Sequence, residues 1–327
     1  MDLLINHFWE LTITGLAIGA VYALVALGYT MVYGVLRLIN FAHSEVFMWG
    51  SFAAVWALMA VGAGKASGLG LAGYLVIGFV AAMTVSALIA MLLERVAYRP
   101  LRKRNSPPLI ALISAIGASF ALSELMGLRD KPLGWFNLEN LRDYLGRPRE
   151  NLPLPLQIQT KAVFPVFNYD VTNIDLIVLL SAIVMMVILD QFIRRSRLGR
   201  GIRAVAMDPE AAALMGINRD RVIRLTFLIG GIMAGAAAMM YLLKIGVTRY
   251  NAGFILGVKA FTAAVLGGIG NIRGALLGGF VLGVAENYGS ALFGSQWKDV
   301  VAFLLLVVIL LFRPTGLLGE SLGKARA

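Results

Sequence analysis

Apolar residues in this chain form long runs that are separated by short polar links. Nine such runs cover 11–35, 39–63, 71–93, 109–127, 174–193, 225–244, 254–270, 274–292 and 299–312. A helix needs about 20 apolar residues to cross the hydrocarbon core of a bilayer, and most of these runs approach that length. The pattern predicts an all-α, polytopic membrane helix bundle with about 8–10 transmembrane segments. Residues 1–327 are expected to form a single transmembrane domain.

Composition supports a membrane protein and argues against several other classes. Hydrophobic residues make up 59% of the chain and charged residues only 14%, whereas soluble domains carry about 25% charged residues. The net charge of +11 does not indicate nucleic-acid binding, because the basic residues cluster between apolar runs. With no cysteine and two histidines, the chain has no metal-ligand spacing. It also lacks a phosphate-binding loop and a nucleophile with a base, so we predict no cofactor, metal or catalytic residue.

The distribution of charge between the runs predicts the orientation in the membrane. The 94–108 link carries five basic residues against one acid, and the 194–224 link carries eight arginines against three acids. Residues 128–173 instead hold basic and acidic residues in near balance. Because cytoplasmic loops are enriched in Lys and Arg, we expect the two basic links inside and 128–173 as an external loop. The N-terminus is then periplasmic and the C-terminus cytoplasmic.

The second basic link contains the signals of a short helix. Asp208 suits an N-cap, Pro209 suits the first helical position, and Glu210 favours the positive end of a helix. Gly216 can end the helix in a left-handed turn. The result is a helix of about seven residues, which is too short to be stable alone in water. It is either a docking element for a partner or a simple interfacial turn.

Several motifs resemble those of a known family. Residues 210–216 read E-A-A-A-L-M-G and match the E-A-A-x-x-x-G signature of ABC importer permeases. Residues 39–45 read I-N-F-A-H-S-E, similar to the I-N-F-A-H-G-E segment of branched-chain amino-acid permeases, with serine replacing the usual glycine. The runs at 22–31, 259–270 and 313–319 also resemble that family. The chain is therefore similar to the shorter, H-type permease subunit of branched-chain amino-acid ABC importers.

This resemblance implies a multi-pass permease of the bacterial inner membrane that is not itself an enzyme. Its implied partners are an M-type permease, two cytoplasmic ABC ATPases that hydrolyse ATP, and a periplasmic solute-binding protein; pairing with a second copy of itself stays open. The 194–224 segment would be the cytoplasmic coupling loop. The residues implied in ATPase coupling are Asp208, Pro209, Glu210, Ala211, Ala212 and Gly216.

The substrate implied by the resemblance is a branched-chain or other apolar amino acid. Urea, a short amide or another small solute would suit the same architecture. An ATPase-independent secondary transporter or channel is the alternative from a different class. The helix expected at 208–217 argues against that alternative, because such a transporter needs no ATPase-docking element.

Polar residues inside the apolar runs are the candidates for the translocation pathway. Asn40, His43 and Glu45 lie near the start of one run, and Lys259 and Thr262 lie in a later one. An ionisable group at the centre of a bilayer costs ~2.5–3.5 kcal/mol or more, and it usually faces a partner or water. These residues therefore line the pathway or make structural hydrogen bonds. Glu45 and Lys259 are candidates to pair with each other across the two halves, which the sequence leaves open.

Two segments are expected to be interrupted helices, at 37–50 and 254–279, one in each half of the chain. Interrupted helices form binding sites in many transporters. Three lone acids near the ends of the runs are expected to be interfacial or paired rather than transport sites: Glu124, Asp190 and Glu286.

Overall fold

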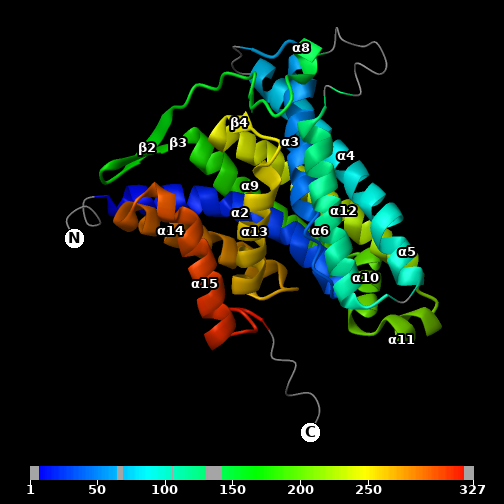
Figure 1. Ribbon diagram of the computed structural model, residues 1–327. Helices are drawn as coiled ribbons and strands as arrows, with labels where there is room; N and C mark the ends of the chain where they lie inside the picture. The colour runs from blue at the N-terminus through cyan, green and yellow to red at the C-terminus, as the bar shows by residue number, and fades with distance from the viewer. Residues whose placement is uncertain (1–6, 65–68, 105, 130, 132–141, 320–327) are drawn as a thin grey trace. The chain divides into compact units, whose positions relative to one another are not determined.

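The computed structural model describes residues 7–64, 69–104, 106–129, 131 and 142–319 (Figure 1). Its contacts divide the chain into two units. The first unit comprises residues 1–37, 160–226 and 258–327, and the second comprises 38–159 and 227–257. Two helices, α12 (Arg219–Ile245) and α13 (Ala252–Gly267), begin in one unit and end in the other. The units are described separately below.

The first unit is built on α2 (Phe8–Leu36) and α14 (Ile272–Phe293), which pack along each other (Figure 1). A hairpin of β2 (Ala162–Val166) and β3 (Tyr169–Thr172) leads into α9 (Asn173–Arg195). The Thr172 hydroxyl and the Asp175 carboxylate form a capping box there, which fixes where α9 begins. The remaining elements are α10 (Arg197–Met207), α11 (Pro209–Leu214), the 3₁₀ turn η3 (Ser295–Trp297) and α15 (Lys298–Phe312).

The second unit contains α3 (His43–Ala60), α4 (Leu69–Leu93) and α6 (Pro108–Gly127). The π-helical segment η1 (Glu94–Tyr98) and α5 (Arg99–Lys103) continue α4 without a break, and α8 (Arg142–Leu145) is a single turn. Two short strands, β1 (Leu152–Pro153) and β4 (Val247–Thr248), pair antiparallel. This pairing ties the segment expected as an external loop to the end of α12. Residues 130 and 132–141 of that loop lie outside the described part.

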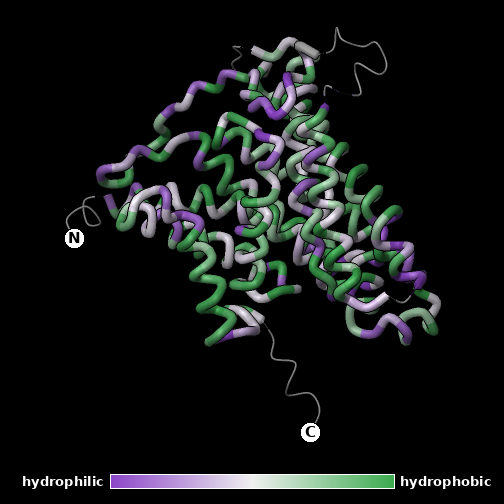
Figure 2. Tube along the Cα trace, viewed as in Figure 1, coloured by the Kyte–Doolittle hydropathy of each residue, from purple (hydrophilic) through white to green (hydrophobic). Residues whose placement is uncertain are grey.

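Every apolar run predicted from the sequence corresponds to one helix. Within the described residues, seven helical segments are long and apolar enough to cross a membrane: Phe8–Leu36, Gly70–Lys103, Pro108–Gly127, Asn173–Arg195, Arg219–Ile245, Ile272–Phe293 and Ser295–Phe312. The two other runs form α3, with 18 residues, and the shorter apolar helix α13, with 16. Figure 2 shows α15 as mostly hydrophobic, whereas hydrophilic residues appear at α5. The polytopic helical architecture is therefore confirmed.

The two basic links contain more helix than the sequence pattern suggested. Arginine is a good helix former, so α4 runs through η1 and α5 to Lys103, and only residues 104–107 separate it from α6. In the 194–224 segment, α10 occupies eleven residues. Its buried residues are Gly199, Ile202 and Val205, at a spacing of three, with arginines between them. That spacing is the signal by which α10 can be recognised.

Glycine pairs permit the closest helix packing in the first unit. Gly15 and Gly19 of α2 face Gly279 and Gly283 of α14. A Cβ atom added to Gly19 would lie 2.5 Å from the Gly279 carbonyl oxygen and 3.0 Å from the next Cα, which is too close for any side chain. Small residues at this spacing let helix backbones touch. These glycines therefore serve the close packing of α2 against α14.

Candidate functional site

The short helix expected in the second basic link is present as α11, with six residues between α10 and α12. Asp208 is its N-cap: one carboxylate oxygen accepts hydrogen bonds from the N–H groups of Glu210 at 2.9 Å and Ala211 at 3.0 Å. Pro209 occupies the first helical position, where its missing N–H costs nothing. The sequence therefore fixes the start of this helix by two independent local devices.

The end of α11 is fixed by a glycine turn. Gly216 has φ +82°, a left-handed conformation that residues with a Cβ rarely adopt. The N–H of Ile217 donates to the Ala212 carbonyl at 3.0 Å, and the N–H of Gly216 donates to the Ala213 carbonyl at 3.0 Å. These nested bonds form a Schellman motif, which satisfies carbonyls that the end of a helix leaves unpaired. Together the two caps make α11 a defined turn of helix.

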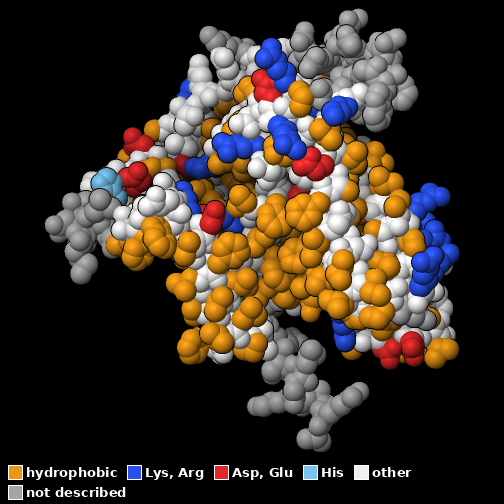
Figure 3. Space-filling view, in the orientation of Figure 1, with side chains coloured by type: hydrophobic (Ala, Val, Ile, Leu, Met, Phe, Trp, Pro, Cys, Tyr) orange, Lys and Arg blue, Asp and Glu red, His pale blue; other side chains and the backbone are white. Residues whose placement is uncertain are grey.

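The surface around α11 exposes large apolar side chains. Met207, Leu214 and Met215 are 82%, 89% and 83% exposed. In Figure 3, acidic and hydrophobic side chains lie side by side at the position of α11. An exposed apolar cluster with a polar rim is typical of a protein-interaction site. Ala212 is the exception, because its side chain is buried and anchors the helix.

Helix α10 attaches α11 to the membrane helices of the first unit. The Ser196 hydroxyl caps α10 by accepting from the Gly199 N–H at 2.8 Å. Arg203 donates to the Arg194 carbonyl at 3.3 Å, and Arg37 donates to the Ala206 carbonyl at 3.2 Å. The described 194–224 segment is therefore a bonded helix–turn–helix rather than a free link.

In the second unit, Glu45 lies close to the middle of α6 and to the start of α13. Its side chain is buried, and one oxygen accepts from the Ser119 hydroxyl at 3.2 Å. A Cβ atom added to Gly253 would lie 2.5 Å from the other carboxylate oxygen and 2.8 Å from the Ser44 carbonyl. Glycine is therefore required where α13 begins. The carboxylate stands beside the positive end of that helix, which stabilises a negative charge.

A break between helices lies in each of the two segments where the sequence suggested an interrupted helix. Between α2 and α3, Arg37 adopts φ 52° and ends α2 in a left-handed turn. Between α13 and α14, Gly268 and Gly270 have φ +107° and +94°. As a result, α3 starts as a separate helix after the first break, and α13 ends at the second. The pathway role of these segments stays a prediction.

Asn40 is held by a residue that the sequence pattern did not single out. Its side-chain oxygen accepts from the Tyr98 hydroxyl at 2.9 Å, and both side chains are buried. Tyr98 belongs to η1, and π-helical turns often occur at functional sites. Glu94, at the start of η1, is also buried and pairs with Arg102 at 2.9 Å. No sequence pattern marks a π-turn, so this contact required the structure.

Lys259 has two acidic partners, and both lie in the first unit. Its ammonium group is 2.5 Å from a Glu286 oxygen and 2.7 Å from an Asp299 oxygen, and it lies 5.8 Å from the ring centre of Tyr22. Glu45, in the second unit, has Ser119 instead. Each residue therefore has its own partners within its own unit, and the pairing that the sequence left open is not observed.

The remaining candidates have the following surroundings. The Thr262 hydroxyl donates to the Val258 carbonyl of its own helix at 2.9 Å, and His43 is buried at the start of α3. Each of the three lone acids is paired, as expected. Their ion pairs are Glu124 with Arg149, Asp190 with Arg194 and Arg273, and Glu286 with Lys259.

Comparisons with known proteins place the chain in one family. The family model described as "Branched-chain amino acid transport system / permease component" matches residues 11–310. The high-affinity branched-chain amino acid transport system permease protein BraD of Pseudomonas aeruginosa is 42% identical, over 97% of each chain. The corresponding protein LivH of Escherichia coli is 42% identical over 96% of each. The fructose import permease protein FrcC of Rhizobium meliloti is 32% identical, but over only 44% of this chain and 39% of its own.

The family match covers nearly the whole chain, including α11, the polar residues of α3, and Lys259 with its two acidic partners. Two full-length relatives at 42% identity agree with it. This chain therefore belongs to the family of permease components of branched-chain amino acid transport systems.

Proposed function

We propose that this chain is the permease subunit of an ABC importer that moves branched-chain amino acids across the bacterial inner membrane. Two observations support this: the full-length relatives are permeases of high-affinity branched-chain amino acid transport systems, and seven of the described helical segments are suited to span a membrane. The chain is a transport subunit and not an enzyme. ATP hydrolysis takes place on separate subunits.

The full assembly contains two permeases, two cytoplasmic ATPases and a periplasmic solute-binding protein. In this proposal the second permease is the related M-type subunit. The N-terminus lies in the periplasm and the C-terminus in the cytoplasm. The charge distribution along the chain supports this orientation, because the arginine-rich segments α5 and 194–224 then face the cytoplasm.

The observation that carries the coupling role is the geometry of α11. It is capped at both ends, and it presents Leu214 and Met215 outward together with Met207 at the end of α10. A capped helix whose neighbours are bonded to the membrane helices can transmit a push without deforming. ATP-driven closure of the ATPases would move α11, and this movement would switch the pathway between inward- and outward-facing forms.

The extent of the matches supports an amino-acid substrate over a sugar, while urea and short amides stay the alternatives to be tested. The amino-acid permeases match over nearly the full length of the chain, whereas the fructose permease matches less than half of it. Uptake of radiolabelled leucine and urea by vesicles containing the complete importer separates these substrates. Urea uptake without leucine uptake would reject the assignment.

Substitution of Gly216 by valine tests the coupling role. A β-branched residue in a left-handed conformation costs about 1–2 kcal/mol, and the added bulk would face the ATPase. Gly62→Val is a matched control, because Gly62 also has positive φ and no neighbouring atom within 4 Å of an added Cβ. Both variants therefore suffer the same kind of strain, but only one lies beside α11.

We expect Gly216→Val to abolish leucine uptake while its amount in the membrane equals that of Gly62→Val. ATP hydrolysis by the complex should no longer respond to loaded binding protein, or the ATPase should dissociate during purification. Normal uptake with normal stimulation in Gly216→Val would refute the coupling role of α11.

A further inference from the structure

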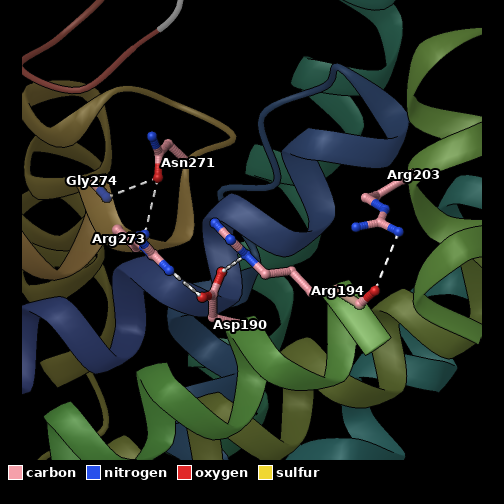
Figure 4. A network of polar contacts seen from close by, with 6 residues as sticks. All are labelled: Asp190, Arg194, Arg203, Asn271, Arg273 and Gly274. Atoms are coloured by element: carbon pink, nitrogen blue, oxygen red, sulfur yellow. Dashed lines mark hydrogen bonds and ion pairs between the residues drawn. The ribbon is translucent and has the colours of Figure 1, made fainter. Parts of the chain in front are cut away.

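Asp190 joins helices α9 and α14 near the coupling loop of the first unit (Figure 4). It lies on α9, and one of its carboxylate oxygens accepts from Arg194 Nε at 2.9 Å. The other accepts from Arg273 of α14, from Nε at 3.3 Å and from Nη2 at 3.0 Å. Its side chain is 13% exposed, whereas both arginines are more than half exposed. One carboxylate therefore holds two guanidinium groups from different helices.

On one side, this network leads to the coupling loop. The carbonyl oxygen of Arg194 accepts a hydrogen bond from Arg203 of α10 at 3.3 Å (Figure 4). Helix α10 ends at Met207, and the next residue, Asp208, caps α11. Asp190 is therefore connected to α11 through hydrogen bonds and the length of α10.

On the other side, the network leads to the glycine-rich turn between α13 and α14. Arg273 lies in the first turn of α14, which Asn271 caps by accepting from the N–H groups of Arg273 at 3.0 Å and Gly274 at 3.1 Å. The Asn271 amide also donates to the Leu318 carbonyl at 2.8 Å. Asn271 therefore joins the turn to the last described segment of the chain.

That C-terminal segment is bonded to the turn by its backbone as well. The N–H groups of Leu317 and Leu318 donate to the carbonyls of Leu266 at 2.8 Å and Gly267 at 3.0 Å. We call residues 313–319 the C-terminal staple. The staple and Arg273 hold the α13–α14 turn from two sides, and α13 carries Lys259, a candidate for the pathway.

We propose that Asp190 is a positioning residue that carries the movement of the coupling loop to the α13–α14 turn. The proposal rests on the coupling role of α11 proposed above. Exposed ion pairs add little to stability, so the network is poorly suited to holding the fold together. Two charge-assisted N–H groups of Arg273 that meet at one Asp190 oxygen instead constrain direction as well as distance. When α10 and α11 move the end of α9, Asp190 makes the start of α14 follow.

The test uses the complete importer in proteoliposomes with the variants Asp190→Asn and Arg273→Gln and the double variant. Asn has nearly the same shape as Asp but no charge, so it weakens both guanidinium contacts without a gap in packing. Glu124→Gln is the matched control, because it removes another exposed arginine–carboxylate pair of similar length, 3.1 Å. The reporter is a single cysteine at Ile269, in the turn, because the chain has no cysteine of its own.

We expect each single variant to reduce leucine uptake by about five-fold or more, as a coupling interaction of ordinary strength would. The double variant should be no worse than the more severe single, because both remove the same link. In the wild type, ATP should change the rate of thiol labelling at position 269, and this response should be lost in Asp190→Asn. Glu124→Gln should retain both uptake and response, and all variants should keep the ATPase bound and unfold near the wild-type temperature.

Normal uptake in Asp190→Asn would overturn the role of Asp190. So would a double variant in which the losses of uptake of the two single variants add, or an unchanged labelling response in Asp190→Asn. These results are distinguishable from failure of the proposed function. If Gly216→Val is inactive and Asp190→Asn is normal, α11 couples by another route. If Gly216→Val is normal, the coupling role of α11 itself is rejected.

Discussion

Lys259 is a charged side chain within an apolar helix, and the groups around it account for its presence there. Glu286 is also buried, and the two lie at hydrogen-bonding distance, 2.5 Å. Asp299 is half exposed and adds a second carboxylate, while the Tyr22 ring supplies a cation–π contact. The lysine ties α13 to α14 and α15. A lysine in an apolar run can be predicted to need an acidic partner. The partners themselves could not be predicted, because they follow Lys259 by 27 and 40 residues in the sequence.

Removal of Lys259 alone should be costly. Lys259→Met leaves the Glu286 carboxylate buried without its cation, which typically costs about 3–5 kcal/mol. We expect a clear fall in the thermal unfolding temperature of the purified importer. Combining Lys259→Met with Glu286→Gln removes both charges and should recover most of the loss. A double variant that is as unstable as Lys259→Met alone would show that the ion pair is not the cause.

Glu45 should matter for transport more than for assembly. It is a buried carboxylate with one hydroxyl donor, Ser119, beside the first turn of α13. Glu45→Gln keeps its size and removes its charge, so the electrostatic interaction with α13 is weakened. Leucine uptake should fall well below that of Glu150→Gln, which alters an exposed acid of the same unit. Equal uptake by the two variants at equal membrane levels would remove Glu45 from the pathway.

At the scale of elements, the apolar runs predicted where helices form, and capping residues predicted where α11 begins. Asp208 with Pro209 predicted the start of α11, and Gly216 its end, because these signals are local. Helix α10 and the π-helical segment η1 were not predicted. The arginine-rich composition suggested an irregular link, although arginine is a good helix former. The buried face of α10 has only three residues, so its periodic signal is weak. Contacts such as Tyr98 with Asn40 depend on tertiary packing, which no local pattern encodes.

The close packing of α2 against α14 leads to a prediction at the scale of elements. A valine at position 19 has no space, since its Cβ would meet the α14 backbone at 2.5–3.0 Å. The helices must separate, and overpacking of this kind typically costs about 1–3 kcal/mol. Gly19→Val should therefore lower the unfolding temperature of the purified importer. Gly34→Val, on the same helix, has no neighbour within 4 Å and should have a much smaller effect. Similar stability of the two would contradict the close packing.

At the scale of the whole molecule, the fold class and the family could both be predicted from the sequence. Hydrophobic runs predict membrane helices because backbone groups in lipid must be satisfied within the segment. The motifs at 39–45, 210–216 and 259–270 pointed to the family that the full-length relatives also indicate. The division into two units could not be predicted, because each unit joins segments that are far apart in sequence.

Orientation can be tested directly, because the chain has no cysteine. Single cysteines at Arg104, Arg147 and Arg200 sample the two basic segments and the loop between them. An impermeant thiol reagent added to intact cells should label only position 147, and all three after the cells are opened. Labelling of position 200 in intact cells would reverse the orientation and remove α11 from reach of the ATPase.

The C-terminal staple also has a consequence for the order in which the protein is made. Residues 317 and 318 bond to the turn that follows α13, yet they are synthesised only after the whole of α14 and α15. Chains fold from the N-terminus as they emerge, so the carbonyls of Leu266 and Gly267 stay unbonded to the staple until both later helices have been made. Completion of this turn therefore follows the synthesis of two further membrane helices, and a chain that stops before residue 317 would reach the membrane with the turn unsecured.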